Sequence, residues 1–215
     1  MRGPGEYRGN GPPVLRVAAT LRRGVSTLAA GMAYLAGWNY IACALFITAD
    51  VVGRNLFGVS SAATVEITGY MLAGGIAWAL AHTLARGSHI RVDVWVNRLP
   101  LRARAALHLL ALLLLGAFAG FAAWAAWSLV DESLLFDAHD NSAWRVPLAV
   151  PQGVWLFGLL AFCAAIGVFA LEAALLLVHS RPDAVDRLLG SRTVDDEAQE
   201  ALEAVEMARQ EEHAA

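Results

Sequence analysis

The chain divides into four long apolar runs that are separated by short polar segments. Each run has the length of about 20 residues or more that a helix needs to cross a hydrocarbon core of about 30 Å. Strands of a membrane barrel would alternate apolar and polar positions, and these runs do not alternate. The pattern predicts an all-α integral membrane protein with four transmembrane helices and short interfacial segments in the loops. The expected spans are residues 25–49, 67–85, 105–130 and 153–178.

Composition supports the membrane class. Of 215 residues, 58% are hydrophobic and only 16% are charged, whereas soluble domains have about 25% charged residues. Cys43 and Cys163 both fall inside apolar runs, where thiols behave as small hydrophobes, so neither a disulfide framework nor a metal site is indicated. We expect the lipid bilayer to be a partner and expect no nucleic acid.

The arginines predict the orientation in the membrane. All 16 basic residues are arginines, and 14 of them precede the first run, lie between the second and third, or follow the fourth. The other two connections hold one each, Arg54 and Arg145. The positive-inside rule then places both termini in the cytoplasm. The expected organisation is a cytoplasmic N-terminal tail (1–24), a four-helix membrane domain (25–180) and an acidic, solvated cytoplasmic C-terminal tail (181–215).

Charged residues near the ends of the runs allow two interpretations. Asp50 and Arg54 are four positions apart and can pair along one helix face. Glu66 opens the second run, where a helix N-terminus favours an anion. These residues form either a ladder of ion pairs across the 50–66 connection or a contact with a partner protein. Glu172 lies within the fourth run, about two turns from its end, where it can reach headgroups or a cation of a partner.

Two histidines support an alternative function. His82 and His108 lie near the same end of adjacent antiparallel spans, so two imidazoles at similar depth could ligate a haem in the membrane anchor of a respiratory redox enzyme. Against this, the sequence has no second pair of ligands and no haem-attachment motif. Nor does it contain a metal-ligand spacing, a nucleophile–base pair or a phosphate-binding glycine loop. We therefore expect no cofactor and no enzymatic activity.

The apolar runs also carry information about helix packing and about transport. The second run has small residues at spacings that permit close helix contact, namely Gly69, Ala73, Gly74 and Ala77. The runs lack the interrupted helices and mid-membrane polar groups that secondary transporters use. A free-standing transporter or channel is therefore disfavoured.

The connection between the second and third runs is the most specific segment. "RGSHIRVDVWVNRLPLRAR" resembles the signature of the small permease subunit (DctQ type) of tripartite ATP-independent periplasmic (TRAP) transporters. The matching residues include His89, Asp93 and Pro100. "DVVGRNLFG", "TVEITGY" and "VPQGVWLFG" are also similar to family segments, and the likeness covers roughly residues 25–178. The chain departs from the family where two consecutive glutamates are frequent, because only Glu66 is present.

The resemblance implies a division of labour and a location in the bacterial inner membrane. In such systems a periplasmic substrate-binding protein captures an organic acid, and a large membrane permease carries it with sodium. The small subunit packs against the large one and stabilises it. No substrate or sodium ligand is then expected in this chain. The candidates for family-motif or interaction roles are Asp50, Arg54, Glu66, His89, Asp93 and Pro100, and His89 could pair with Asp93 if that segment is helical.

Overall fold

The protein is all-helical in the residues that the computed structural model describes, which are 12–87, 96, 99–190, 202, 205–207 and 209. Four helices are long and apolar enough to cross a membrane. The predicted class, an all-α protein with four membrane helices, is therefore confirmed. The helices are α1 (Pro13–Phe57), α2 (Thr64–Ala85), α4 (Leu101–Leu135), α5 (Ala149–Val178) and the short α6 (Pro182–Leu189).

The four long helices extend beyond the predicted spans, either at both ends or at their start. Helix α1 begins at Pro13, where a proline is favourable because the first N–H of a helix has no partner within it. It ends at Phe57, and the C-cap Gly58 that follows has a φ of 66°, the left-handed conformation common after helix ends. Helix α4 begins directly after Pro100. Capping residues set these helix ends, whereas the predicted spans followed only the apolar runs.

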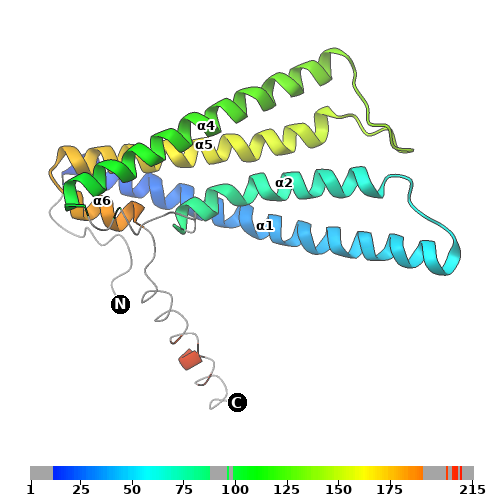
Figure 1. Cartoon of the computed structure of the whole chain (residues 1–215), viewed down its shortest axis with the longest axis horizontal. Coiled ribbons are helices and arrows are strands. Elements are labelled where there is room, and N and C mark those ends of the chain that lie inside the picture. The colour runs from blue at the N-terminus through cyan, green and yellow to red at the C-terminus, as the bar shows by residue number, and fades with distance from the viewer. Residues whose placement is uncertain are drawn as a thin grey trace.

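Helix α5 is the centre of the bundle (Figure 1). It packs against α1, α2, α4 and α6, and α1 and α2 also pack against each other. Helix α4 contacts mainly α5 and α6, and it separates from α5 toward the α4–α5 connection. Of the four long helices, α5 has the most buried apolar segment. The arrangement is a set of helices around α5 and leaves one side of α1 and of α4 uncovered.

Small residues allow the closest helix approaches. A Cβ added to Gly158 of α5 would lie 2.8 Å from the Cβ of Ala77 in α2. A Cβ on Gly75 would lie 2.7 Å from the Tyr40 ring of α1. The prediction of close packing is right for Gly74 and Ala77, which are buried. Gly69 and Ala73, the other two positions that it named, are exposed in this chain, so for them close packing stays a prediction.

Helix α6 lies in the segment predicted to be a solvated tail. Its Ala184, Val185 and Leu189 are buried, and the helix packs against the beginning of α4 and the end of α5. This docking was not predicted from the sequence, because the apolar face of α6 is short: these three residues and the partly buried Leu188. The end of the bundle where α6 lies is called the α6 end below. The opposite end, with the α1–α2 and α4–α5 connections, is called the loop end (Figure 1).

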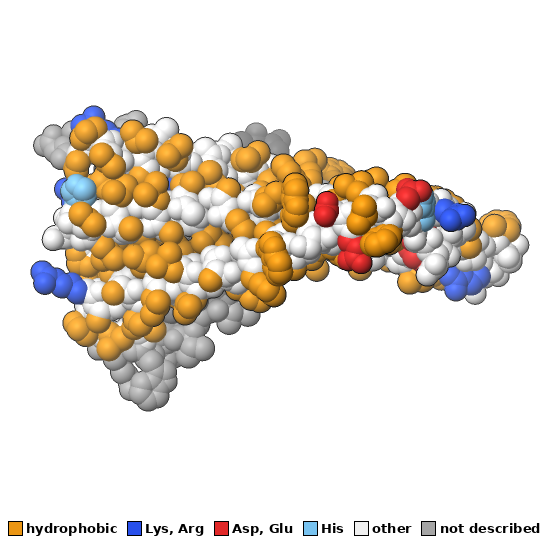
Figure 2. Space-filling view, turned by 90° about the horizontal axis from the view of Figure 1, so that it is seen from above, with side chains coloured by type: hydrophobic (Ala, Val, Ile, Leu, Met, Phe, Trp, Pro, Cys, Tyr) orange, Lys and Arg blue, Asp and Glu red, His pale blue; other side chains and the backbone are white. Residues whose placement is uncertain are grey.

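The surface has the pattern that a membrane protein requires. On the face that Figure 2 shows, apolar side chains cover the left and middle parts, arginine and histidine side chains lie at the left edge, and the acidic side chains lie in the right half. An apolar band between charged ends matches a hydrocarbon core between two polar interfaces.

Candidate functional site

The buried polar side chains lie near the ends of the helices. In the part of the chain that the structure describes, no buried polar residue occupies the middle of a membrane helix. This placement agrees with the sequence, in which most charged residues lie at or beyond the ends of the apolar runs. The buried polar residues are Asp50, Thr68, His108, Ser133, Ser142 and Glu172.

At the loop end, the Asp50 carboxylate holds the α1–α2 turn. Its side chain is only 2% exposed. It accepts hydrogen bonds from Arg54 Nη2 at 2.5 Å, Ser60 Oγ at 3.0 Å and the Ser61 backbone N–H at 2.7 Å. Both oxygens of the carboxylate are thus hydrogen-bonded within the chain, whereas the Arg54 side chain is 61% exposed. Of this pair, only the arginine remains accessible to a partner.

The predicted ladder of ion pairs does not reach Glu66. This residue is half-buried in the first turn of α2, where the helix N-terminus favours its charge. Among the described residues, no ion pair involves Glu66, so a ladder that includes it is wrong. The pair of Asp50 with Arg54 is local, since the partners are four positions apart.

The α4–α5 connection is organised around Asp140. Its Oδ1 accepts hydrogen bonds from Ser142 Oγ at 2.9 Å, the Ser142 N–H at 3.2 Å and the Val146 N–H at 2.9 Å. Burial alone would raise the pKa of Asp140, but these hydrogen bonds outweigh it and hold the pKa below its ordinary value. The Tyr70 hydroxyl donates to Oδ2 at 3.3 Å, which links the connection to α2.

At the α6 end, an ion pair joins the first and last membrane helices. Arg22 Nε of α1 lies 2.8 Å from Glu172 Oε2 of α5, with side chains 14% and 5% exposed. The sequence suggested headgroups or a partner's cation for Glu172, and the structure instead gives it a partner 150 positions away. The signal that could have found this pair is that both residues lie near the arginine-rich ends of the predicted spans.

A second polar cluster ties α6 to α4. Arg104 Nη2 lies 2.5 Å from Asp186 Oδ2, and His108 Nε2 lies 3.4 Å from Asp186 Oδ1. His108 is buried, and its Nε2, the nitrogen that would bind haem iron, faces this carboxylate. His82 is half-buried, and its Nδ1 has no hydrogen-bond partner in the described chain. The haem interpretation therefore gains no support from the arrangement of its two histidines.

The remaining candidates are placed as follows. Pro100 is the N-cap of α4, and its carbonyl accepts the Arg104 N–H at 3.1 Å. His89 and Asp93 lie outside the described residues, so their predicted pairing stays a prediction. Within the described part of the chain, no group of three or more His, Cys, Asp or Glu side chains could hold a metal ion.

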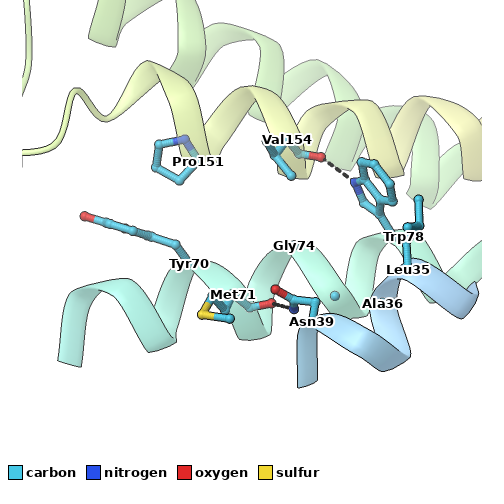
Figure 3. Close-up of a pocket in the computed structure, with 10 residues that line it drawn as sticks. Leu35, Ala36, Asn39, Tyr70, Met71, Gly74, Trp78, Pro151 and Val154 are labelled. Carbon is cyan, nitrogen blue, oxygen red and sulfur yellow. Dashed lines mark hydrogen bonds between the residues drawn. The ribbon is translucent and has the colours of Figure 1, made fainter. Parts of the chain in front are cut away.

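An apolar recess of about 310 Å³ opens between α1, α2 and α5 (Figure 3). Two of its polar groups are already bonded across helices, Asn39 Nδ2 to the Met71 carbonyl at 2.6 Å and Trp78 Nε1 to the Val154 carbonyl at 2.9 Å. Its lining contains no charged side chain. An organic anion would have no cation to bind here, so the recess suits an apolar group.

The four apolar helices define a multi-pass membrane protein. A family model described as "Tripartite ATP-independent periplasmic transporters, DctQ component" matches residues 43–178. Because the match covers well over half of the chain, the chain belongs to this family, and the resemblance seen in the sequence is confirmed. No curated protein and no solved structure matches the chain.

Proposed function

We propose that this chain is the accessory small permease subunit of a TRAP-type secondary transporter, which packs against the large permease and stabilises it. The observation that carries the proposal is that, among the described residues, the middle of the bundle contains no charged side chain and no fully buried polar one. A path for an organic acid or a sodium ion requires polar groups at mid-membrane depth. Family membership supports the assembly with a large permease and a periplasmic binding protein.

The orientation and the transported solute belong to the same proposal. The excess of arginines beside the α6 end supports placing both termini in the cytoplasm, with the loop end facing the periplasm. The large permease then carries an organic acid together with sodium, and the binding protein determines which acid. Arg54, with its exposed guanidinium on the periplasmic side, is the candidate among the loop-end residues for contact with a partner.

Deleting the chain in cells that keep the large permease tests this assignment. We expect the amount of large permease in the membrane and the uptake of the organic acid to fall together, and both to return when the chain is restored. A tagged large permease should also retain the chain during purification in detergent. Unchanged levels of large permease and unchanged uptake after deletion would refute the accessory role.

A further inference from the structure

Helix α1 has an exposed stripe on the side that faces away from the bundle. Its members recur every three or four positions, which places them on one face of the helix. The buried residues Ala29, Met32, Ala36 and Cys43 lie on the opposite face. The α1 stripe consists of Thr27, Gly31, Tyr34, Trp38, Ile41, Leu45 and Thr48, all of which are exposed.

Two aromatic residues of the α1 stripe lie at mid-membrane depth. At about 1.5 Å per residue, Trp38 lies about 22 Å along the helix from Arg23 and about 18 Å from Asp50. Tyr34 lies one turn closer to Arg23. Their exposed fractions are 76% for Tyr34 and 68% for Trp38. Tyrosine and tryptophan normally occupy the interfaces of a membrane, because each carries one polar group that needs a partner.

These two polar groups have no partner in the described chain. Other polar side chains at similar depth are bonded, as Asn39 is to Met71 and Trp78 is to Val154. The two threonines of the stripe bond to the carbonyl four positions earlier in their own helix. Neither the Tyr34 hydroxyl nor the Trp38 indole N–H makes a hydrogen bond to a described residue. Lipid tails supply no acceptor, and burying a hydrogen-bond donor without an acceptor in an apolar medium is strongly unfavourable.

Helix α4 provides the contrast within the same molecule. Its exposed side at mid-depth consists of hydrocarbon, with Leu114 at 63%, Phe118 at 70% and Phe121 at 64% exposed. Its exposed tryptophans, Trp124 and Trp127, lie within two turns of Asp131, where an aromatic belt belongs. This face of α4 needs no hydrogen-bond partner at mid-depth and can face lipid, whereas the α1 stripe has two donors there for which lipid offers no acceptor.

We infer that the α1 stripe is the face on which this chain docks a transmembrane helix of the large permease, and that the outward side of α4 faces lipid. The inference rests on the proposed function and adds the surface and its chemistry. The docked helix offers acceptor oxygens at mid-depth to Tyr34 and Trp38. It also approaches closely at Gly31, where a Cβ would meet nothing within 4 Å in this chain.

Two matched glycine substitutions test the assignment. Gly31→Leu and Gly120→Leu both place a large side chain in open space, since a Cβ added to either glycine would meet no atom within 4 Å. Both should leave this chain folded. With a tagged large permease, we expect Gly31→Leu to reduce the amount of co-purified chain by about tenfold and Gly120→Leu to leave it unchanged. Equal retention of both variants, equal loss of both, or loss of Gly120→Leu alone would overturn the inference.

Photocrosslinking tests the same face without relying on weakened binding. A benzoylphenylalanine in place of Trp38 should crosslink to the large permease in whole membranes, and one in place of Phe121 should not. Crosslinks from position 38 only to lipid, or to a second copy of this chain, would overturn the assignment of the face. If the unsubstituted chain itself fails to co-purify with the large permease, the proposed function fails, which distinguishes the two outcomes.

Discussion

The two ends of the bundle are held by different kinds of contact. At the α6 end, Arg22 and Glu172 join α1 to α5 across 150 sequence positions, and Arg104 joins α4 to Asp186 of α6. At the loop end, the corresponding hydrogen bonds are mostly local. Asp50 binds residues within 11 positions, and the Asp140 carboxylate bonds mainly within its own connection.

This difference indicates which end fixes the arrangement of the helices. Long-range ion pairs at the α6 end set the positions of α1, α4, α5 and α6 relative to one another. Local contacts at the loop end shape each turn and connect the α1–α2 pair less to the α4–α5 pair, through the hydrogen bonds of Tyr70 to Asp140 and of Trp78 to the Val154 carbonyl. Within one of these pairs the helices also diverge, because α4 separates from α5 toward the loop end (Figure 1). Substitutions at the α6 end should therefore destabilise the bundle more than those at the loop end.

The largest effect is expected for Glu172→Ala. The substitution leaves the Arg22 guanidinium, whose side chain is 14% exposed, without its partner. Removing one member of a buried pair lowers stability by about 3–5 kcal/mol. Thermal unfolding in detergent should show this loss, and a Glu172→Met/Arg22→Met double variant should recover most of it. A Glu172→Ala variant as stable as the original chain would contradict the role given to the α6 end.

An intermediate effect is expected for Asp186→Ala. It removes a partner of Arg104 and of His108, and because the Arg104–Asp186 pair is about a quarter exposed, we expect the free energy of unfolding to fall by about 1–2 kcal/mol. Asp183→Ala in the same helix is the matched control, since it removes an exposed pair with Arg187 and should lower stability by less than about 1 kcal/mol. The rate of protease cleavage after Val178 measures how far each substitution releases α6. Equal accessibility in the two variants would mean that Asp186 does not dock α6.

A smaller loss of stability is expected at the loop end, and it should differ between substitutions of Asp50 and of Arg54. Asp50→Ala leaves the Ser61 N–H without an acceptor and removes the carboxylate that pairs with Arg54. Arg54→Ala removes only an exposed guanidinium, and Asp50 keeps its hydrogen bonds from Ser60 and Ser61. Asp50→Ala should therefore lower the melting temperature in detergent by more than Arg54→Ala does. The reverse order would show that the arginine, and not the carboxylate, holds the turn.

The smallest effect is a dependence on pH. Hydrogen bonds hold the pKa of Asp140 below its ordinary value, so the ionised form is favoured in the folded protein. The resulting stabilisation is fully present above the unfolded-state pKa of about 3.9 and is lost as the pH falls through the folded-state pKa. The difference in melting temperature between the original chain and Asp140→Asn should thus be widest near neutral pH and narrow as the pH falls below the unfolded-state pKa. A difference that grows as the pH falls would contradict this assignment.

The same contrast explains how much of the structure the sequence predicted. Apolar runs fix the membrane helices, and the four-residue spacing of Asp50 and Arg54 indicates their pair, because both signals are local. The partner of Glu172 and the docking of α6 depend on helices that are distant in sequence, and no local spacing encodes them. Family motifs add the assignment to a transporter, but they do not identify which face of α1 or α4 meets a partner.

The sequence also could not show that the middle of α1 has exposed donors without hydrogen-bond partners among the described residues. Tyr34 and Trp38 read as ordinary members of an apolar run. Their importance depends on exposure and on missing hydrogen-bond partners, both of which require the positions of the neighbouring helices.

The central claim, that this chain supports a larger permease and carries no solute itself, is tested most directly by uptake into liposomes. Three preparations should be compared in the presence of the periplasmic binding protein, an inward sodium gradient and the organic acid: this chain alone, the large permease alone, and both together. We predict uptake at background level for this chain alone and the highest uptake for the two together. Solute uptake well above background by this chain alone would contradict the account.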